Sequence, residues 1–117
     1  MTMQEYELDA YLGDAEVTDE QREQIRAAAG AVGARYPDPD LSDLRTEAFS
    51  GAVQVILGDR TLEGIGAAYA RARALERAAL ATLTGAIIAS AGPGVSEYDL
   101  QRRSGVTRPT IRKALGK

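Results

Sequence analysis

Cationic side chains that can bind anionic groups are concentrated at one end of this sequence. Residues 97–117 hold six Arg or Lys residues and two acidic ones, for a charge of +4. Residues 1–60 hold 13 acidic residues and five Arg (−8), and residues 61–96 hold two acidic residues and three Arg (+1). A basic end on an acidic body is typical of a chain that contacts nucleic acid through that end. The alternative is that these cations only complement the negative ends of short helices, where Lys and Arg are common.

Side chains suited to catalysis or metal binding are scarce. The 117 residues contain no His, which removes the usual general base, the usual zinc ligand and a Ser–His triad, and no Cys, which removes disulfides and thiolate metal sites. Gly64 and Gly66 lie within a helical pattern and follow no strand, so they do not form a phosphate loop. Asp38 and Asp40 lack the spacing of a calcium loop and are typical of turns. We therefore expect no enzyme, no cofactor and no metal site.

The basic end opens with signals for a short helix. Ser96 is a typical N-cap and has Asp99 three residues later, a capping-box spacing with Asp in place of Glu or Gln. Val95 and Leu100 flank that cap as a hydrophobic staple. The pattern predicts a helix over residues 97–103.

A turn and a second helix follow. Gly105 can adopt the left-handed conformation that ends helices. Thr107 is then expected to cap the next helix, with Pro109 in its first turn, where no N–H partner is lost. Val106 and Ile111 repeat the staple. Two short helices joined by a glycine turn indicate a helix-turn-helix.

The segment LQRRSGVTRPTIRKAL, residues 100–115, resembles the helix-turn-helix of bacterial transcription regulators. It is most similar to the gluconate-repressor type and also resembles lactose-repressor-type sequences. The resemblance extends over residues 96–116. It rests on apolar, glycine and hydroxyl positions at matching spacing, namely Leu100, Gly105, Val106, Thr107, Ile111, Ala114 and Leu115.

Two features depart from that family. Gln101 stands where the family has a small residue, commonly Ala, at the point where the two helices cross. Gluconate-repressor-type regulators also continue into a β-hairpin wing, whereas this sequence stops at Lys117. We therefore expect three helices without a wing, with residues 76–91 as the supporting first helix.

The resemblance implies which side chains face DNA. It inserts a helix over residues 108–116 into the major groove of double-stranded DNA. The residues placed against base edges are Thr107, Arg108, Arg112 and Lys113. Arg suits this role because it can bond the O6 and N7 atoms of one guanine together. Contacts to phosphates, which position a protein without reading sequence, are expected from Arg102, Arg103, Thr110 and Lys117.

The rest of the chain has helical signals throughout. The predicted fold class is therefore all-α, a helical bundle with a C-terminal three-helix helix-turn-helix. Thr18 and Gln21 form a capping box, and the apolar pattern behind them runs to about Arg35. Other helices are expected over residues 3–12, from Asp40 or Ser42 to about Gly58, and, opened by Thr61, over residues 62–91.

The second half of the long helix, ALATLTGAIIAS at residues 79–90, is apolar nearly all round. It is expected to be buried on every side, either by the N-terminal helices or by a second copy of the chain. We therefore predict a homodimer that uses this segment together with the helix near residues 41–57. The expected organisation is an acidic helical region at 1–60, for packing or partner binding, and a long helix plus DNA-binding region at 61–117.

These features together predict a sequence-specific DNA-binding protein that regulates transcription, as a repressor or similar regulator, in a bacterium or phage. The alternative is an antitoxin-like or adaptor protein whose acidic N-terminal helices bind a protein partner; a purely structural bundle is a second alternative. The N-terminus is acidic where a signal peptide would be basic, so we expect a cytoplasmic, nucleoid-associated protein without membrane contact.

Overall fold

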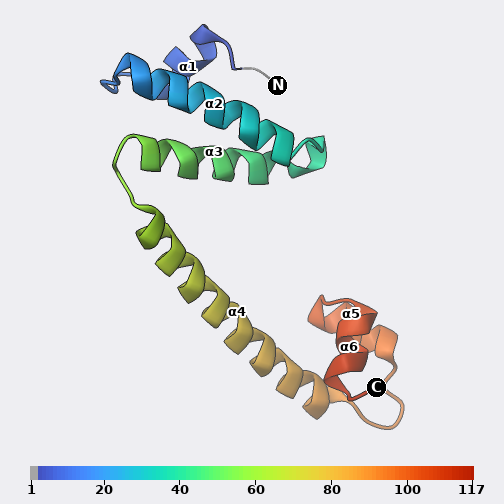
Figure 1. The fold of residues 1–117 in the computed structure, drawn as a ribbon. Helices are drawn as coiled ribbons and strands as arrows, with labels where there is room; N and C mark the ends of the chain where they lie inside the picture. The colour runs from blue at the N-terminus through green and yellow to red at the C-terminus, as the bar shows by residue number, and fades with distance from the viewer. Residues whose placement is uncertain (1–2) are drawn as a thin grey trace. The chain divides into compact units, whose positions relative to one another are not determined.

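The computed structural model describes residues 3–117. These residues form six α-helices and one short 3-10 helix, without strands, which confirms the all-α prediction. In chain order they are α1 (Glu5–Leu12), α2 (Asp19–Arg35), η1 (Pro39–Leu41), α3 (Ser42–Ile56), α4 (Leu62–Ser90), α5 (Glu97–Ser104) and α6 (Arg108–Ala114) (Figure 1). The chain divides into two compact units: unit 1 ends at Ala67, and unit 2 covers Ala68–Lys117.

The predicted capping residues define where the long helices begin. Thr18 Oγ1 accepts a hydrogen bond from the Gln21 backbone N–H at 3.0 Å, and Gln21 Oε1 accepts one from the Thr18 N–H at 2.9 Å. Thr61 Oγ1 accepts one from the Gly64 N–H at 3.0 Å at the start of α4. These bonds satisfy amide donors that have no partner within the helix, so the predicted starts of α2 and α4 are confirmed.

Unit 1 is built around three buried side chains, one from each of its first three α-helices. Leu8 of α1 and Ile25 of α2 are fully buried, and Val53 of α3 is 6% exposed. Tyr11 and Phe49 add an aromatic contact, with ring centroids 4.9 Å apart. The helices thus bury one apolar face each, as the helical spacing of these residues predicts.

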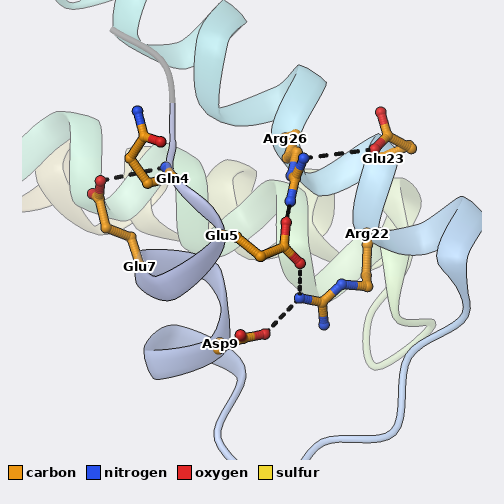
Figure 2. Close-up of polar contacts among 7 residues, drawn as sticks. All are labelled: Gln4, Glu5, Glu7, Asp9, Arg22, Glu23 and Arg26. Atoms are coloured by element: carbon orange, nitrogen blue, oxygen red, sulfur yellow. Dashed lines mark hydrogen bonds and ion pairs between the residues drawn. The ribbon is translucent and has the colours of Figure 1, made fainter.

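Arginines of α2 hold α1, which is too short to be a stable helix on its own. Figure 2 shows Arg22 paired with both Glu5 and Asp9 of α1, and Arg26 paired with Glu5 and with Glu23 of its own helix. The acidic partners are more than half exposed, so each pair contributes modestly to stability. Part of the acidic charge of unit 1 is therefore matched within the unit.

Unit 2 has its own core, to which three helices contribute. Ile87 of α4 and Leu100 of α5 are each 3% exposed, and Ile111 of α6 is fully buried. Partly buried apolar side chains surround them: Leu83, Ala91, Val95, Val106, Ala114 and Leu115. All of the apolar positions on which the family resemblance rests thus face this core.

The second half of α4 differs from its prediction. Within residues 79–90 only Ile87 is buried, and Leu83, Thr84 and Ser90 are half-buried, while the other side chains are exposed. Leu80 is 49% exposed and Ile88 is 55% exposed. Unit 2 alone therefore does not bury this segment, because α5 and α6, with 8 and 7 residues, cover only one strip of the helix. Burial of the rest by a second copy of the chain stays a prediction.

No helix within residues 3–117 has both the length and the apolar composition needed to cross a bilayer.

Candidate nucleic-acid interface

Helix α5 begins as predicted at Ser96. The Ser96 Oγ accepts a hydrogen bond from the Asp99 N–H at 3.0 Å. The reciprocal half of the predicted capping box is missing, because the Asp99 carboxylate turns to other partners. It accepts a hydrogen bond from Arg102 Nη2 at 2.7 Å and lies 3.5 Å from Arg103 Nη1. The Asp99 carboxylate thus binds the guanidinium groups of Arg102 and Arg103, one turn later, and not the backbone N–H of Ser96.

The turn between α5 and α6 forms at the predicted glycine. Gly105 has φ 79° and ψ 2°, and its N–H donates to the Gln101 carbonyl at 2.9 Å. A left-handed residue with this bond is a common helix ending. Gln101, which departs from the family, is half-buried and lines a hollow beside Tyr98 and Val106.

Helix α6 starts at the predicted place but with a different hydrogen bond. Thr107 has the extended backbone of an N-cap, with φ −74° and ψ 160°. Its hydroxyl lies 3.0 Å from the Thr110 hydroxyl and bonds no backbone N–H. The predicted side-chain cap at Thr107 is therefore wrong, and Pro109, which has no N–H to satisfy, occupies the first turn.

The end of α6 also differs from the predicted range of 108–116, since the helix stops at Ala114. Gly116 adopts φ 76°, its N–H donates to the Lys113 carbonyl at 3.1 Å, and the Lys117 N–H donates to the Arg112 carbonyl at 2.8 Å. These two bonds form a Schellman motif, which closes the helix and fixes the backbone of Lys117.

Three of the predicted DNA-contacting residues converge on one carboxylate, that of Glu97 at the start of α5. Arg108 Nε donates to Glu97 Oε1 at 3.1 Å. Arg112 Nη1 donates to Oε1 at 3.1 Å and to Oε2 at 3.0 Å, and Lys117 Nζ lies 3.6 Å from Oε2. We call Glu97 with these three cations the Glu97 cluster. It ties the first turn of α5 to both ends of α6.

Exposure within the Glu97 cluster is unequal. The Glu97 side chain is 15% exposed, whereas those of Arg108, Arg112 and Lys117 are 64%, 48% and 54% exposed. The carboxylate therefore lies beneath the cations, which keep their outer surfaces in solvent.

The remaining predicted site residues separate into two groups. Arg102 and Arg103 both pair with Asp99 on α5 and are more than half exposed. Thr107 and Lys113 are exposed and Thr110 is half-buried. Within the described chain, Lys113 is the one cation of residues 97–117 without an acidic partner.

The cations lower the pKa of both acidic groups of this segment. Hydrogen bonding from Arg108 lowers the pKa of Glu97 most, partial burial opposes it, and hydrogen bonding and charge from Arg112 lower it further. Hydrogen bonding from Arg102 is the main cause of the lowered pKa of Asp99, again against partial burial. Both carboxylates are ionised at neutral pH, so the segment retains its charge of +4, with five of its six cations paired to Glu97 or Asp99.

Glu97 is the residue of this cluster that sequence reasoning missed. From sequence it counted only as one of the two acidic residues of segment 97–117 and had no assigned role. Its partners Arg108 and Arg112 lie 11 and 15 residues away in the chain. Only the packing of α5 against α6, centred on Leu100 and Ile111, brings them together.

Comparison with known proteins returns no matching family model, no matching curated protein and no matching solved structure. Functional reasoning therefore rests on the geometry of this chain.

Proposed function

We propose that unit 2 is a helix-turn-helix DNA-binding module of a transcription regulator, which inserts α6 into the major groove. The observation that carries the proposal is the division of α6 into two sides. Ile111 is fully buried against Ile87 and Leu100, so the opposite side of a short helix must face solvent. Lys113 lies on that side, and Arg108 and Arg112, beside Ile111 on the helix surface, are also exposed, in a segment of charge +4.

The dimensions of α6 are compatible with this role. A helix of 7 residues is about 10 Å long at about 1.5 Å per residue. With its side chains an α-helix is about 10–12 Å across, which matches a major groove roughly 12 Å wide. Thr107 and Arg108 at the start of α6, and Arg112 and Lys113 one turn later, are proposed to contact base edges. Phosphate contacts are proposed for Arg102, Arg103, Thr110 and Lys117.

A salt titration tests binding to DNA. Selection from a random double-stranded DNA pool, followed by sequencing, should return a preferred site. Affinity for that site should then fall steeply and linearly on a logarithmic plot as salt is raised, since each neutralised phosphate releases counterions. If the pool yields no enriched site and binding at low salt is absent, the proposal is wrong.

A pair of double variants tests the assigned face. Arg112→Ala with Lys113→Ala should abolish preference for the selected site while helical content stays unchanged. The matched control is Arg71→Ala with Arg77→Ala, which removes the same charge from exposed positions of α4 in the same unit. We expect the control to keep its sequence preference. Equal losses in both variants would mean that net charge, and not α6, determines binding.

We further propose that the protein binds DNA as a homodimer. A single short helix contacts few base pairs, so useful affinity normally requires two copies on half-sites about 34 Å apart. Exposed apolar side chains on α4 support a second copy as the covering surface. Tyr69 is 59% exposed and Leu80 is 49% exposed. Leu80 lies three and seven residues before Leu83 and Ile87, hence on the side of α4 that carries the unit 2 core.

A second candidate function concerns unit 1, the acidic half of the chain. An open hollow of ≈ 330 Å³ on this unit is lined mainly by apolar side chains, including Met3, Tyr11, Val32 and Phe49, with Glu7, Arg45 and Thr46 beside them. This surface favours a protein partner that inserts an apolar side chain, as in an antitoxin-like or adaptor protein. Tyr11→Glu should then release a partner that co-purifies with the full chain, while Tyr98→Glu, at an exposed position of unit 2, should retain it. Retention by both variants would contradict this candidate.

A further inference from the structure

The Glu97 carboxylate contacts the two arginines of α6 through only some of their N–H groups. Arg108 donates from Nε, at 3.1 Å, and Arg112 donates from Nη1, at 3.1 and 3.0 Å. Within the described residues, no other acceptor bonds either guanidinium group. Arg108 therefore keeps both Nη groups available, and Arg112 keeps Nη2 and Nε.

The remaining donors suit the recognition of a base edge. Two adjacent N–H groups of one guanidinium can bond guanine O6 and N7 together. Arg108 retains such a pair at its tip and Arg112 retains one along its side. The arginine side chains are 64% and 48% exposed while Glu97 is 15% exposed, so the retained donors lie on the solvent side of the pairs.

We infer that Glu97 is a positioning residue, which fixes Arg108 and Arg112 for the recognition of bases by α6. The inference rests on the proposed DNA-binding function and assigns a specificity role to a residue of α5. An unpaired arginine must lose much of its rotational freedom when it binds a base, and that cost lowers affinity. Arginines that Glu97 already holds lose less rotational freedom when they bind a base. The resulting increase in affinity applies only to DNA of the sequence that they recognise.

Glu97 also carries a negative charge, which opposes phosphate everywhere on DNA. Loss of the Glu97 charge should therefore change the affinities for unrelated DNA and for the selected site in opposite directions. Affinity for DNA of unrelated sequence should increase, because that binding is electrostatic. Affinity for the selected site should decrease, because ordered arginines are lost.

Glu97→Gln in the full chain tests the inference, with Asp99→Asn as the matched control. Both variants remove one negative charge from the first turn of α5, but Asp99 pairs with Arg102 and Arg103 and not with α6. Dissociation constants are measured for the selected site and for a scrambled duplex of equal length. For Glu97→Gln the dissociation constant for the scrambled duplex divided by that for the selected site should fall about tenfold. Asp99→Asn should lower both dissociation constants and leave this ratio unchanged.

Glu97→Asp provides a second variant that keeps the charge but shortens the side chain. It should lower affinity for the selected site without strengthening binding to the scrambled duplex. NMR spectra of the Arg108 and Arg112 side-chain Nε–H groups in free protein should show ordered groups in the original chain and averaged ones in Glu97→Gln. Because these spectra need no DNA, they test the inference even if a variant binds DNA too weakly for its dissociation constants to be compared.

Two outcomes overturn this inference, and a third overturns the function beneath it. If Glu97→Gln strengthens binding to both duplexes equally, Glu97 only repels phosphate. If the arginine Nε–H groups are equally ordered with and without Glu97, the pairs do not position them. If the original chain selects no site at all, the proposed function fails first, and the Glu97 variants are not needed to show it.

Discussion

The Gly105 N–H donates to the Gln101 carbonyl at 2.9 Å, and this bond reverses the chain between α5 and α6. Gly105 can make it because its φ is 79°, in the left-handed region that a Cβ atom disfavours. A Cβ added there would meet no atom within 4 Å, so backbone conformation is the main obstacle to substitution.

Gly105→Ala should therefore destabilise unit 2 by roughly 1 kcal/mol through backbone strain. Gly92→Ala is the matched control, since Gly92 lies in the same unit, also has open space around it and does not have a positive φ. We expect the control to change stability by less than about 0.5 kcal/mol. Urea unfolding followed by unit 2 amide signals would measure both, and equal effects would contradict the assigned role of the turn.

The two units should respond separately to damage in their cores. Ile111 in unit 2 and Ile25 in unit 1 are both fully buried, and they belong to different clusters of apolar side chains. Replacing either with Ala should cost roughly 2–5 kcal/mol, because it removes buried methyl groups and leaves a cavity.

Hydrogen exchange should show faster exchange in unit 2 for Ile111→Ala and in unit 1 for Ile25→Ala. Each variant thereby serves as the control for the other. Loss of protection over the whole chain from a single substitution would show that the two units unfold as one.

Acid should weaken the link between α5 and α6. Hydrogen bonds and charge from Arg108 and Arg112 lower the pKa of Glu97 in the folded chain. A carboxyl group with a lowered folded pKa stabilises the fold above its unfolded pKa, and this contribution disappears as pH falls through the folded value. The contribution of neighbouring Asp99 to stability also disappears as pH falls, because Arg102 and Arg103 lower its pKa.

At pH 7 the original chain should therefore be more stable in unit 2 than Glu97→Gln. The difference between them should shrink as pH falls below the ordinary pKa of a glutamate, 4.5, and vanish once Glu97 is protonated in the folded chain. Thermal unfolding of both proteins across this range measures the effect. A difference that stays constant with pH would mean that the charge of Glu97 does not support the fold.

Local sequence signals predicted most of the fold, because each depends on residues within one turn of a helix. Thr18 with Gln21, Ser96 with the Asp99 N–H, and Gly105 all act as expected. The side-chain cap predicted at Thr107 is absent because the Thr107 hydroxyl bonds the Thr110 hydroxyl and no backbone N–H. Such a choice between two short-range partners is not visible in residue types.

The parts that sequence could not predict depend on packing between elements. The pairing of Glu97 with Arg112 requires the relative placement of two helices, which no local pattern encodes. The exposure of Leu80 and Ile88 has a similar cause. Their apolar character predicts burial, but α5 and α6 are too short to cover that part of α4.

The proposed dimer gives those exposed residues a role that can be tested on α4 itself. Leu80 is 49% exposed on the side of α4 that carries Leu83 and Ile87, so a second copy covering that side would bury it. Leu80→Glu places a charge in the proposed interface and should convert a dimer into a monomer, as measured by sedimentation equilibrium. Ala78→Glu is the matched control, because Ala78 is exposed and two residues earlier, on nearly the opposite side of the helix. A chain that is monomeric before any substitution, or a control that dissociates as fully as Leu80→Glu, would contradict this interface.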